Sequence, residues 1–145
     1  MASLKITIEE KLVLEGVDRG TSTTQTIANI NSVDNRILSC PSESYTSIFS
    51  FNSSSNSGGT FTTGSFKYGR VTNKSSVPVK LFIKSSATTY NTFVVDSYSS
   101  FFISTTSVSA SFFTGQTFTF NDYINEVSVQ PSGSAATVEY FIATT

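Results

Sequence analysis

Apolar and polar side chains alternate along the N-terminal segment of the chain. The aliphatic residues of Leu4–Glu9 occupy every second position, which is the pattern of a strand with one buried face. Leu12 and Leu14 resume the alternation. Gly16–Gly20 then favours a tight reversal, because glycine tolerates positive φ and aspartate accepts hydrogen bonds from its own backbone. We therefore expect an N-terminal strand or arm at residues 1–15 that ends in a turn.

Short β-branched and aromatic runs fill the rest of the chain. Thr21–Ile30 is rich in threonine and predicts a strand, although the spacing of Ile27, Ile30, Val33 and Ile37 also fits a short helical turn. Asn52–Gly59 contains no apolar or charged residue and predicts an exposed loop. The further strands that we expect are Asn35–Cys40, Ser44–Phe51, Ser65–Asn73, Val79–Lys84, Tyr90–Val95, Ser100–Ser104, Val108–Phe113, Thr117–Phe120, Tyr123–Gln130 and Thr137–Ala143.

The spacing of these strands predicts the fold class. Short strands at intervals of about 8–12 residues are typical of a sandwich or barrel, and no sustained helical period of 3.6 residues suggests βαβ units. We find no internal repeat and no change in composition that would mark a linker. The sequence therefore predicts an all-β chain whose residues 1–145 form one antiparallel β-sandwich domain, of jelly-roll-like or Ig-like connectivity.

Charge and length exclude several kinds of partner. Charged residues make up 13% of the 145 residues, about half of the roughly 25% in an average protein, and 13 Phe with 6 Tyr argue against disorder. The net charge is −1 without any basic stripe, so we expect no binding to nucleic acid. No apolar run approaches the roughly 20 residues that cross a bilayer, and the N-terminus lacks the apolar segment of a secretion signal. We expect synthesis in a cytoplasm and no membrane partner.

The residues that usually perform catalysis are missing or isolated. The chain has no histidine, which removes the imidazole base and the commonest zinc ligand. Cys40 precedes Pro41 in an expected strand and is interpreted as a small buried apolar residue. The nearest approach to a calcium loop, Asn121–Glu126, offers few oxygen ligands. We therefore expect no catalytic residue, no metal, no cofactor and no enzymatic activity.

Several strands carry bulky apolar residues at adjacent positions, so that both faces of a sheet would be apolar. Either loops of the same chain cover the second face or a partner subunit does, and burial by a second copy is the more economical account in a domain this small. We expect a homo-oligomer, with a trimer favoured. The candidate interface residues are Phe101, Phe102, Phe112, Phe113, Tyr140 and Phe141.

The stretches that carry a resemblance to known proteins are Ile8–Gly20, Asn35–Leu38, Tyr68–Asn73, Val79–Ile83 and Ser99–Ile103. Together they are similar to small β-rich virion proteins of tailed bacteriophages, which decorate heads or belong to tail assemblies. The resemblance implies a protein that is made in the bacterial cytoplasm, resides in the virion, and binds copies of itself and the major capsid protein or other virion proteins.

Three functional hypotheses follow for the chain. The first is a capsid decoration or cement protein that stabilises a phage head, and the second is a phage tail or neck component. The third, from another class, is a carbohydrate-binding β-sandwich that stacks sugars on exposed rings. The candidate rings for stacking are Tyr45, Tyr68, Tyr90, Tyr98, Tyr123 and Tyr140.

Overall fold

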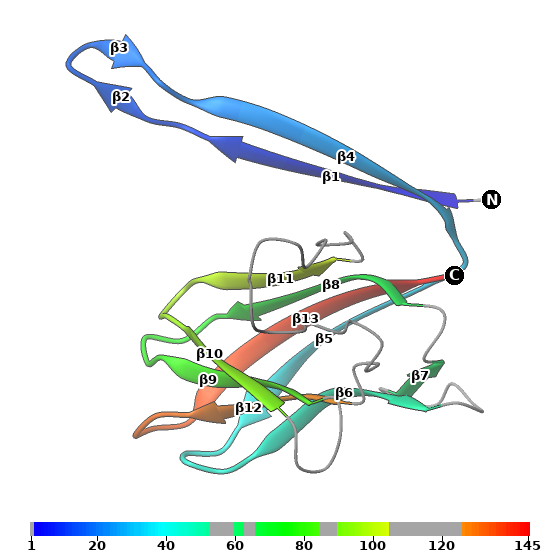
Figure 1. The fold of residues 1–145 in the computed structure, drawn as a ribbon. Coiled ribbons are helices and arrows are strands. Elements are labelled where there is room, and N and C mark those ends of the chain that lie inside the picture. Colours follow the sequence, from blue (N-terminus) through cyan, green and yellow to red (C-terminus); the bar gives the residue numbers. More distant parts are fainter. Residues whose placement is uncertain (1, 53–59, 63–65, 85–89, 105–125) are drawn as a thin grey trace, which may run out of the picture.

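The computed structural model describes residues 2–52, 60–62, 66–84, 90–104 and 126–145, and all regular elements among them are strands (Figure 1). The strands are β1 (Ala2–Glu10), β2 (Val13–Leu14), β3 (Val17–Asp18), β4 (Thr21–Ile30), β5 (Ser32–Cys40), β6 (Thr46–Asn52), β7 (Thr60–Thr62), β8 (Phe66–Asn73), β9 (Val79–Lys84), β10 (Tyr90–Val95), β11 (Ser100–Ser104), β12 (Glu126–Pro131) and β13 (Ala136–Thr144).

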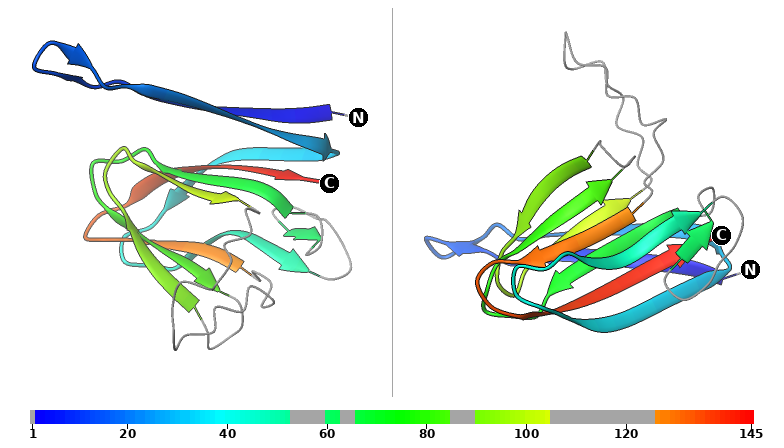
Figure 2. Two further views of the ribbon diagram at one scale, coloured as in Figure 1. Left: turned by 45° about the horizontal axis from the view of Figure 1, so that its top comes forward. Right: turned by 90° about the horizontal axis from the view of Figure 1, so that it is seen from below.

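Strands β5 to β13 form two sheets that pack face to face (Figure 2). One sheet has the order β11-β8-β13-β5, and the other has the order β10-β9-β12-β6-β7. All pairs are antiparallel except β6–β7, which is parallel. The predicted all-β sandwich is thereby confirmed.

The strand order also decides between the two expected connectivities. The pairs β5–β13, β6–β12, β8–β11 and β9–β10 are nested within one another along the chain. Successive nested pairs alternate between the two sheets, and β13–β8 and β12–β9 pairing then completes each sheet. This is the double Greek key of an eight-stranded jelly roll, and it differs from the Ig-like sheet order.

The core lies between the sheets and follows from the period of two along each strand. In β13, Val138, Tyr140 and Ile142 point inward and are buried, whereas Glu139 and Phe141 point to the outer face and are only partly buried. Phe49 of β6 packs its ring against Tyr140 across the interior, with ring centroids 5.7 Å apart. Cys40 is fully buried, as the sequence predicted; burial raises the pKa of its thiol, and a hydrogen bond with Thr46 opposes that rise.

Before the sandwich begins, the chain forms a long hairpin, here called the arm (residues 2–30). Strands β1 and β4 pair antiparallel from Ala2↔Ile30 to Glu10↔Thr21, and the short β2–β3 pair continues the hairpin to its tip. Glu15 and Gly16 close the tip with φ values of 52° and 78°, as a two-residue hairpin loop requires. The expected strand of residues 1–15 is therefore one half of an arm that returns along β4.

Asp18 and Gly20 shape the returning side of the hairpin near its tip. The amide of Gly20 donates a 2.8 Å hydrogen bond to Oδ1 of Asp18, the local bond that the turn sequence predicts. A side chain at position 20 would collide with the carbonyl oxygen of Glu10. Glycine is therefore needed at this position, where the backbone of the opposite arm strand lies too close for a side chain.

Most predicted strands match the observed ones, and Thr21–Ile30 is the strand β4 rather than a helical turn. The short parallel strand β7 was not expected, since three residues carry no periodic signal. The predicted strands Val108–Phe113 and Thr117–Phe120 lie outside the described residues, as do the candidate interface residues Phe112 and Phe113 and the loop 53–59.

Candidate functional site

The base of the arm rests on the outer face of the β11-β8-β13-β5 sheet. Leu4 and Ile6 of β1 and Ile27 and Ile30 of β4 pack against three residues of that face. These residues are Tyr68, Phe141 and Ala143. Because burying an aliphatic or aromatic side chain contributes roughly 1.5–3 kcal/mol when complete, this contact holds the arm against the sandwich.

The sequence left open whether segments of the same chain or a partner subunit cover the second apolar face of a sheet. The arm supplies part of that cover. Tyr68 and Ala143 are buried beneath it, and Phe141 is partly buried. Burial raises the pKa of Tyr68, and the positive charge of Arg70 opposes that rise. Neither a loop nor a second copy is required at these three positions.

An open groove lies between β1 and the outer face of the sheet, and it begins at the base of the arm. A groove of about 420 Å³ lies between Leu4–Ile8 and an opposite wall that includes Phe102, Phe141 and Arg70. Phe102 is 49% exposed and Ile8 is half exposed. The row of aliphatic side chains along β1 therefore extends from Leu4 and Ile6, which pack on the sandwich, to Ile8, which the sandwich leaves half exposed.

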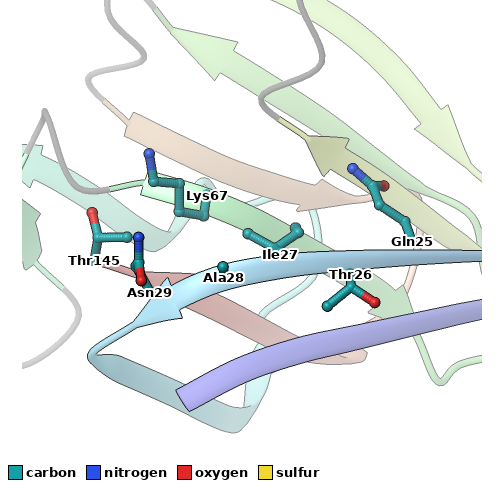
Figure 3. A pocket seen from close by; sticks show the side chains of 7 residues that line it. All are labelled: Gln25, Thr26, Ile27, Ala28, Asn29, Lys67 and Thr145. Atoms are coloured by element: carbon teal, nitrogen blue, oxygen red, sulfur yellow. The ribbon is translucent and has the colours of Figure 1, made fainter. Parts of the chain in front are cut away.

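A second groove, of about 550 Å³, opens along the other side of the arm (Figure 3). It is lined by Gln25–Asn29 of β4 together with Lys67 and Thr145. Gln25 and Ile27 lie on one side of β4, and Thr26 lies on the other. Its wall is mainly polar, so this groove offers less apolar surface than the first.

The tip of the arm projects past the end of the sandwich in Figure 1 and in each view of Figure 2. At a rise of about 3.3 Å per residue, the ten steps from Leu4 to Leu14 span on the order of 30 Å. Val13 is 71% exposed. The exposed aliphatic residues of the tip are Leu12, Val13, Leu14 and Val17.

Charged residues surround this apolar tip. The segment Glu9–Arg19 contains four carboxylates and two cations, and Lys11 lies 3.3 Å from Glu9. An apolar centre with a charged rim is the usual composition of a protein–protein contact surface.

On the sandwich, Glu139 of β13 forms the centre of an ion-pair cluster. Its carboxylate lies 2.6 Å from Nη2 of Arg70 and 3.1 Å from Nζ of Lys74. The hydrogen bond from Lys74 lowers the pKa of Glu139; burial opposes this, and the charges of Lys74 and Arg70 add to it. Within the described residues, Nε of Arg70 is buried without a hydrogen-bond partner.

The structure separates the candidate interface residues that it describes. Phe102 and Phe141 lie on the outer face beside the arm. Phe101 points between the sheets and stacks on Phe93, with ring centroids 4.7 Å apart. Tyr140 is 1% exposed, so the chain's own core covers its ring and its place in the list of surface candidates has to be corrected. Adjacent aromatic residues point to opposite faces, which is why they cannot form one patch.

The tyrosine rings proposed to stack on sugars fall into two groups by their exposure. Tyr45, Tyr90 and Tyr98 are exposed, whereas Tyr68 and Tyr140 are buried. Tyr123 lies outside the described residues.

The sequence reasoning missed the exposed aliphatic tip as a surface. The alternation at Leu12 and Leu14 predicts a strand with one buried face, but both residues are exposed in the structure. The turn at Gly16 is the sequence signal that they lie at the end of a hairpin. Ile27 and Ile30 of β4 form the second half of the surface by which the arm packs on the sandwich. The sequence gives no signal for this role, because it depends on the pairing of β1 with β4.

The described residues hold no group of three or more His, Cys, Asp or Glu side chains placed to bind a metal ion. Of the weak calcium candidates, the structure describes only Glu126, which pairs with Lys84 at 3.2 Å. Among the same residues no helix is long and apolar enough to cross a membrane. Comparison of the chain with protein-family models and with curated proteins finds no match.

Proposed function

We propose that this protein is a non-enzymatic structural subunit of a virus particle, namely a decoration or cement protein of the head of a tailed bacteriophage. The observation that carries the proposal is the projecting arm with its exposed aliphatic tip. Leaving four aliphatic side chains in water is unfavourable. The projecting arm can bury them against a neighbouring subunit. The jelly roll is found in capsid proteins and in lectins, so the proposal rests on the arm and not on the fold.

In this proposal the arm joins neighbouring subunits. The tip of one copy contacts a different surface on the next, and such head-to-tail contacts generate a closed ring when the rotation between copies closes. A trimer is the ring that we favour, with Phe102 and Ile8 beside the contact because both remain half exposed. Many weak contacts of this kind, repeated by symmetry, stabilise a shell through avidity.

The test uses particles of the encoding phage that lack this protein. The purified chain is expected to bind them at saturable, symmetric sites in electron micrographs. The combined variant Val13→Ser, Leu14→Ser, Val17→Ser is expected to keep the thermal midpoint of the wild type, to lose binding, and to form a smaller species in light scattering. Val94→Ser is the control, because Val94 is 64% exposed on β10 and lies outside the arm.

Two results would contradict the proposal. One is a wild-type chain that binds no symmetric site on the particle, and the other is a tip variant that binds and assembles as the wild type does. A copy number comparable with that of the capsid subunits supports the head, whereas a few copies fixed by the symmetry of the tail support the alternative of a tail or neck component.

A further inference from the structure

The outer face of the β10-β9-β12-β6-β7 sheet, which points away from the arm's sheet, carries a connected group of aromatic rings. Tyr45 precedes β6, Phe82 belongs to β9, and Tyr90 begins β10. The ring centroids of Tyr45 and Phe82 are 4.5 Å apart, and those of Phe82 and Tyr90 are 5.9 Å apart. Since β12 lies between β6 and β9, the ring of Tyr45 reaches across β12 to make its contact.

The three rings have different exposures, and this difference defines a platform. Phe82 is buried, whereas Tyr45 and Tyr90 are each 53% exposed. Phe82 therefore acts as an anchor against which two half-exposed rings are packed. A tyrosine held in this way offers an apolar ring surface at a small cost in conformational entropy, because it has few rotatable bonds and these are already restrained.

An ion pair lies between the two exposed rings. Lys84 is opposite Tyr90 in the β9–β10 register and opposite Glu126 in the β9–β12 register. Its Nζ lies 3.2 Å from Oε2 of Glu126 and 5.2 Å from the centroid of the Tyr45 ring. The pair supplies hydrogen-bond donors and acceptors at fixed positions, and its charges cancel.

We propose that this surface, Tyr45, Phe82, Tyr90, Lys84 and Glu126, is a binding platform for uncharged carbohydrate. A pyranose ring has one face of C–H groups, which stacks on an aromatic ring, and a rim of hydroxyls, which bond to charged or polar side chains. Two exposed rings with an ion pair between them match successive sugar units of an oligosaccharide. The balanced charge gives no advantage to sialylated, sulfated or phosphorylated glycans. The platform lies on the opposite sheet from the arm, so it does not depend on the proposed assembly role.

The experiment uses the full-length purified chain on an array of neutral oligosaccharides of glucose, galactose, mannose and N-acetylglucosamine, with sialylated and sulfated glycans beside them. The ligand found there is then titrated by tyrosine fluorescence, which is undisturbed because the chain contains no tryptophan. We expect a neutral glycan to bind with an affinity that is insensitive to salt. Tyr45→Ala and Tyr90→Ala are each expected to weaken binding at least tenfold.

Tyr98→Ala is the matched control, because Tyr98 is 71% exposed in the turn at the opposite end of β10, and it is expected to bind as the wild type does. Tyr45→Leu retains an apolar cover over Phe82 and so separates loss of the ring from loss of folding. The inference is overturned by a silent array, by a preference for charged glycans, or by unchanged binding in the folded Tyr45 and Tyr90 variants. None of these outcomes bears on whether the arm tip drives assembly.

Discussion

The hydroxyl of Tyr140 donates a 2.7 Å hydrogen bond to Oδ2 of Asp34, which lies on the neighbouring strand and 106 residues away in the sequence. Arg36 holds the same carboxylate, with its Nε 3.0 Å from that oxygen. Burial of Tyr140, followed by the hydrogen bond and the negative charge of Asp34, raises the pKa of the phenol to about 12. This bond ties the edge strand β5 to β13 at the point where the jelly roll joins its first and last strands.

Replacing Tyr140 with Phe keeps the ring and removes this bond, so we expect a loss of about 0.5–1.5 kcal/mol in the free energy of unfolding at neutral pH. Because the pKa in the folded state is raised above the ordinary 10.0 to about 12, this stabilisation is complete below pH 10 and is lost as the pH rises towards 12. Urea unfolding between pH 7 and pH 11.5 measures both effects. The difference between wild type and variant should narrow across this interval, and a constant difference would contradict the assignment.

Asn73 is expected to be among the most sensitive polar positions of the sandwich. It is fully buried, and its Nδ2 lies within hydrogen-bond distance of the carbonyl oxygens of Val77, Val95 and Asp96. Its Oδ1 accepts a 3.0 Å bond from the amide of Ser75. One side chain therefore holds the end of β8 against the end of β10.

Asn73→Asp places a carboxylate against three carbonyl oxygens, and we expect it to cost more than the roughly 1–3 kcal/mol of an ordinary unsatisfied buried group. The measurement is the urea midpoint of the variant beside that of Thr72→Ala, which alters the neighbouring outward position. Equal midpoints for the two variants would show that the Asn73 bonds contribute little. Asn73→Asp should also regain part of its stability at acid pH, where the new carboxyl is neutral.

Ser128 provides the opposite case, in which a buried polar atom has no hydrogen-bond partner among the described residues. It lies on the outer side of β12 between Phe82 and Ser47 in register. Removing an unsatisfied hydroxyl avoids its desolvation cost, so Ser128→Ala is expected to be neutral or to stabilise the fold by about 1 kcal/mol. A thermal midpoint that falls clearly below that of the wild type would show that the hydroxyl is bonded.

The docking of the arm can be tested without any partner. Ile6 packs on the sandwich at the arm base, whereas Ile8 is half exposed one pleat further out. We expect Ile6→Ser to raise amide hydrogen exchange in β1 and β4 and to leave exchange in β13 unchanged. Ile8→Ser is the matched control and should change exchange in the arm much less. Equal effects of the two substitutions would mean that the arm is not held at its base.

The sequence by itself determined that the chain is a sandwich of short strands. Period-two alternation and turn residues act within a few positions, so Val79–Lys84, Tyr90–Val95 and Ser100–Ser104 were predicted with the bounds that the structure shows. The reversal at Gly16 was predicted for the same reason, because it depends on local backbone freedom. Burial of Cys40 followed from its place in a strand.

Only the tertiary structure decided which strands pair and which apolar residues remain uncovered. The nested pairs that distinguish a jelly roll from an Ig-like fold join residues far apart in the chain, and no local pattern specifies them. The pattern at Phe101–Phe102 and Tyr140–Phe141 indicated that both sheet faces are apolar, but it did not show that the arm covers one of them. The group formed by Tyr45, Phe82 and Tyr90 depends in the same way on strand order, because the pairing of β9 with β10 and the placement of β9 and β6 on either side of β12 bring the three rings onto one face.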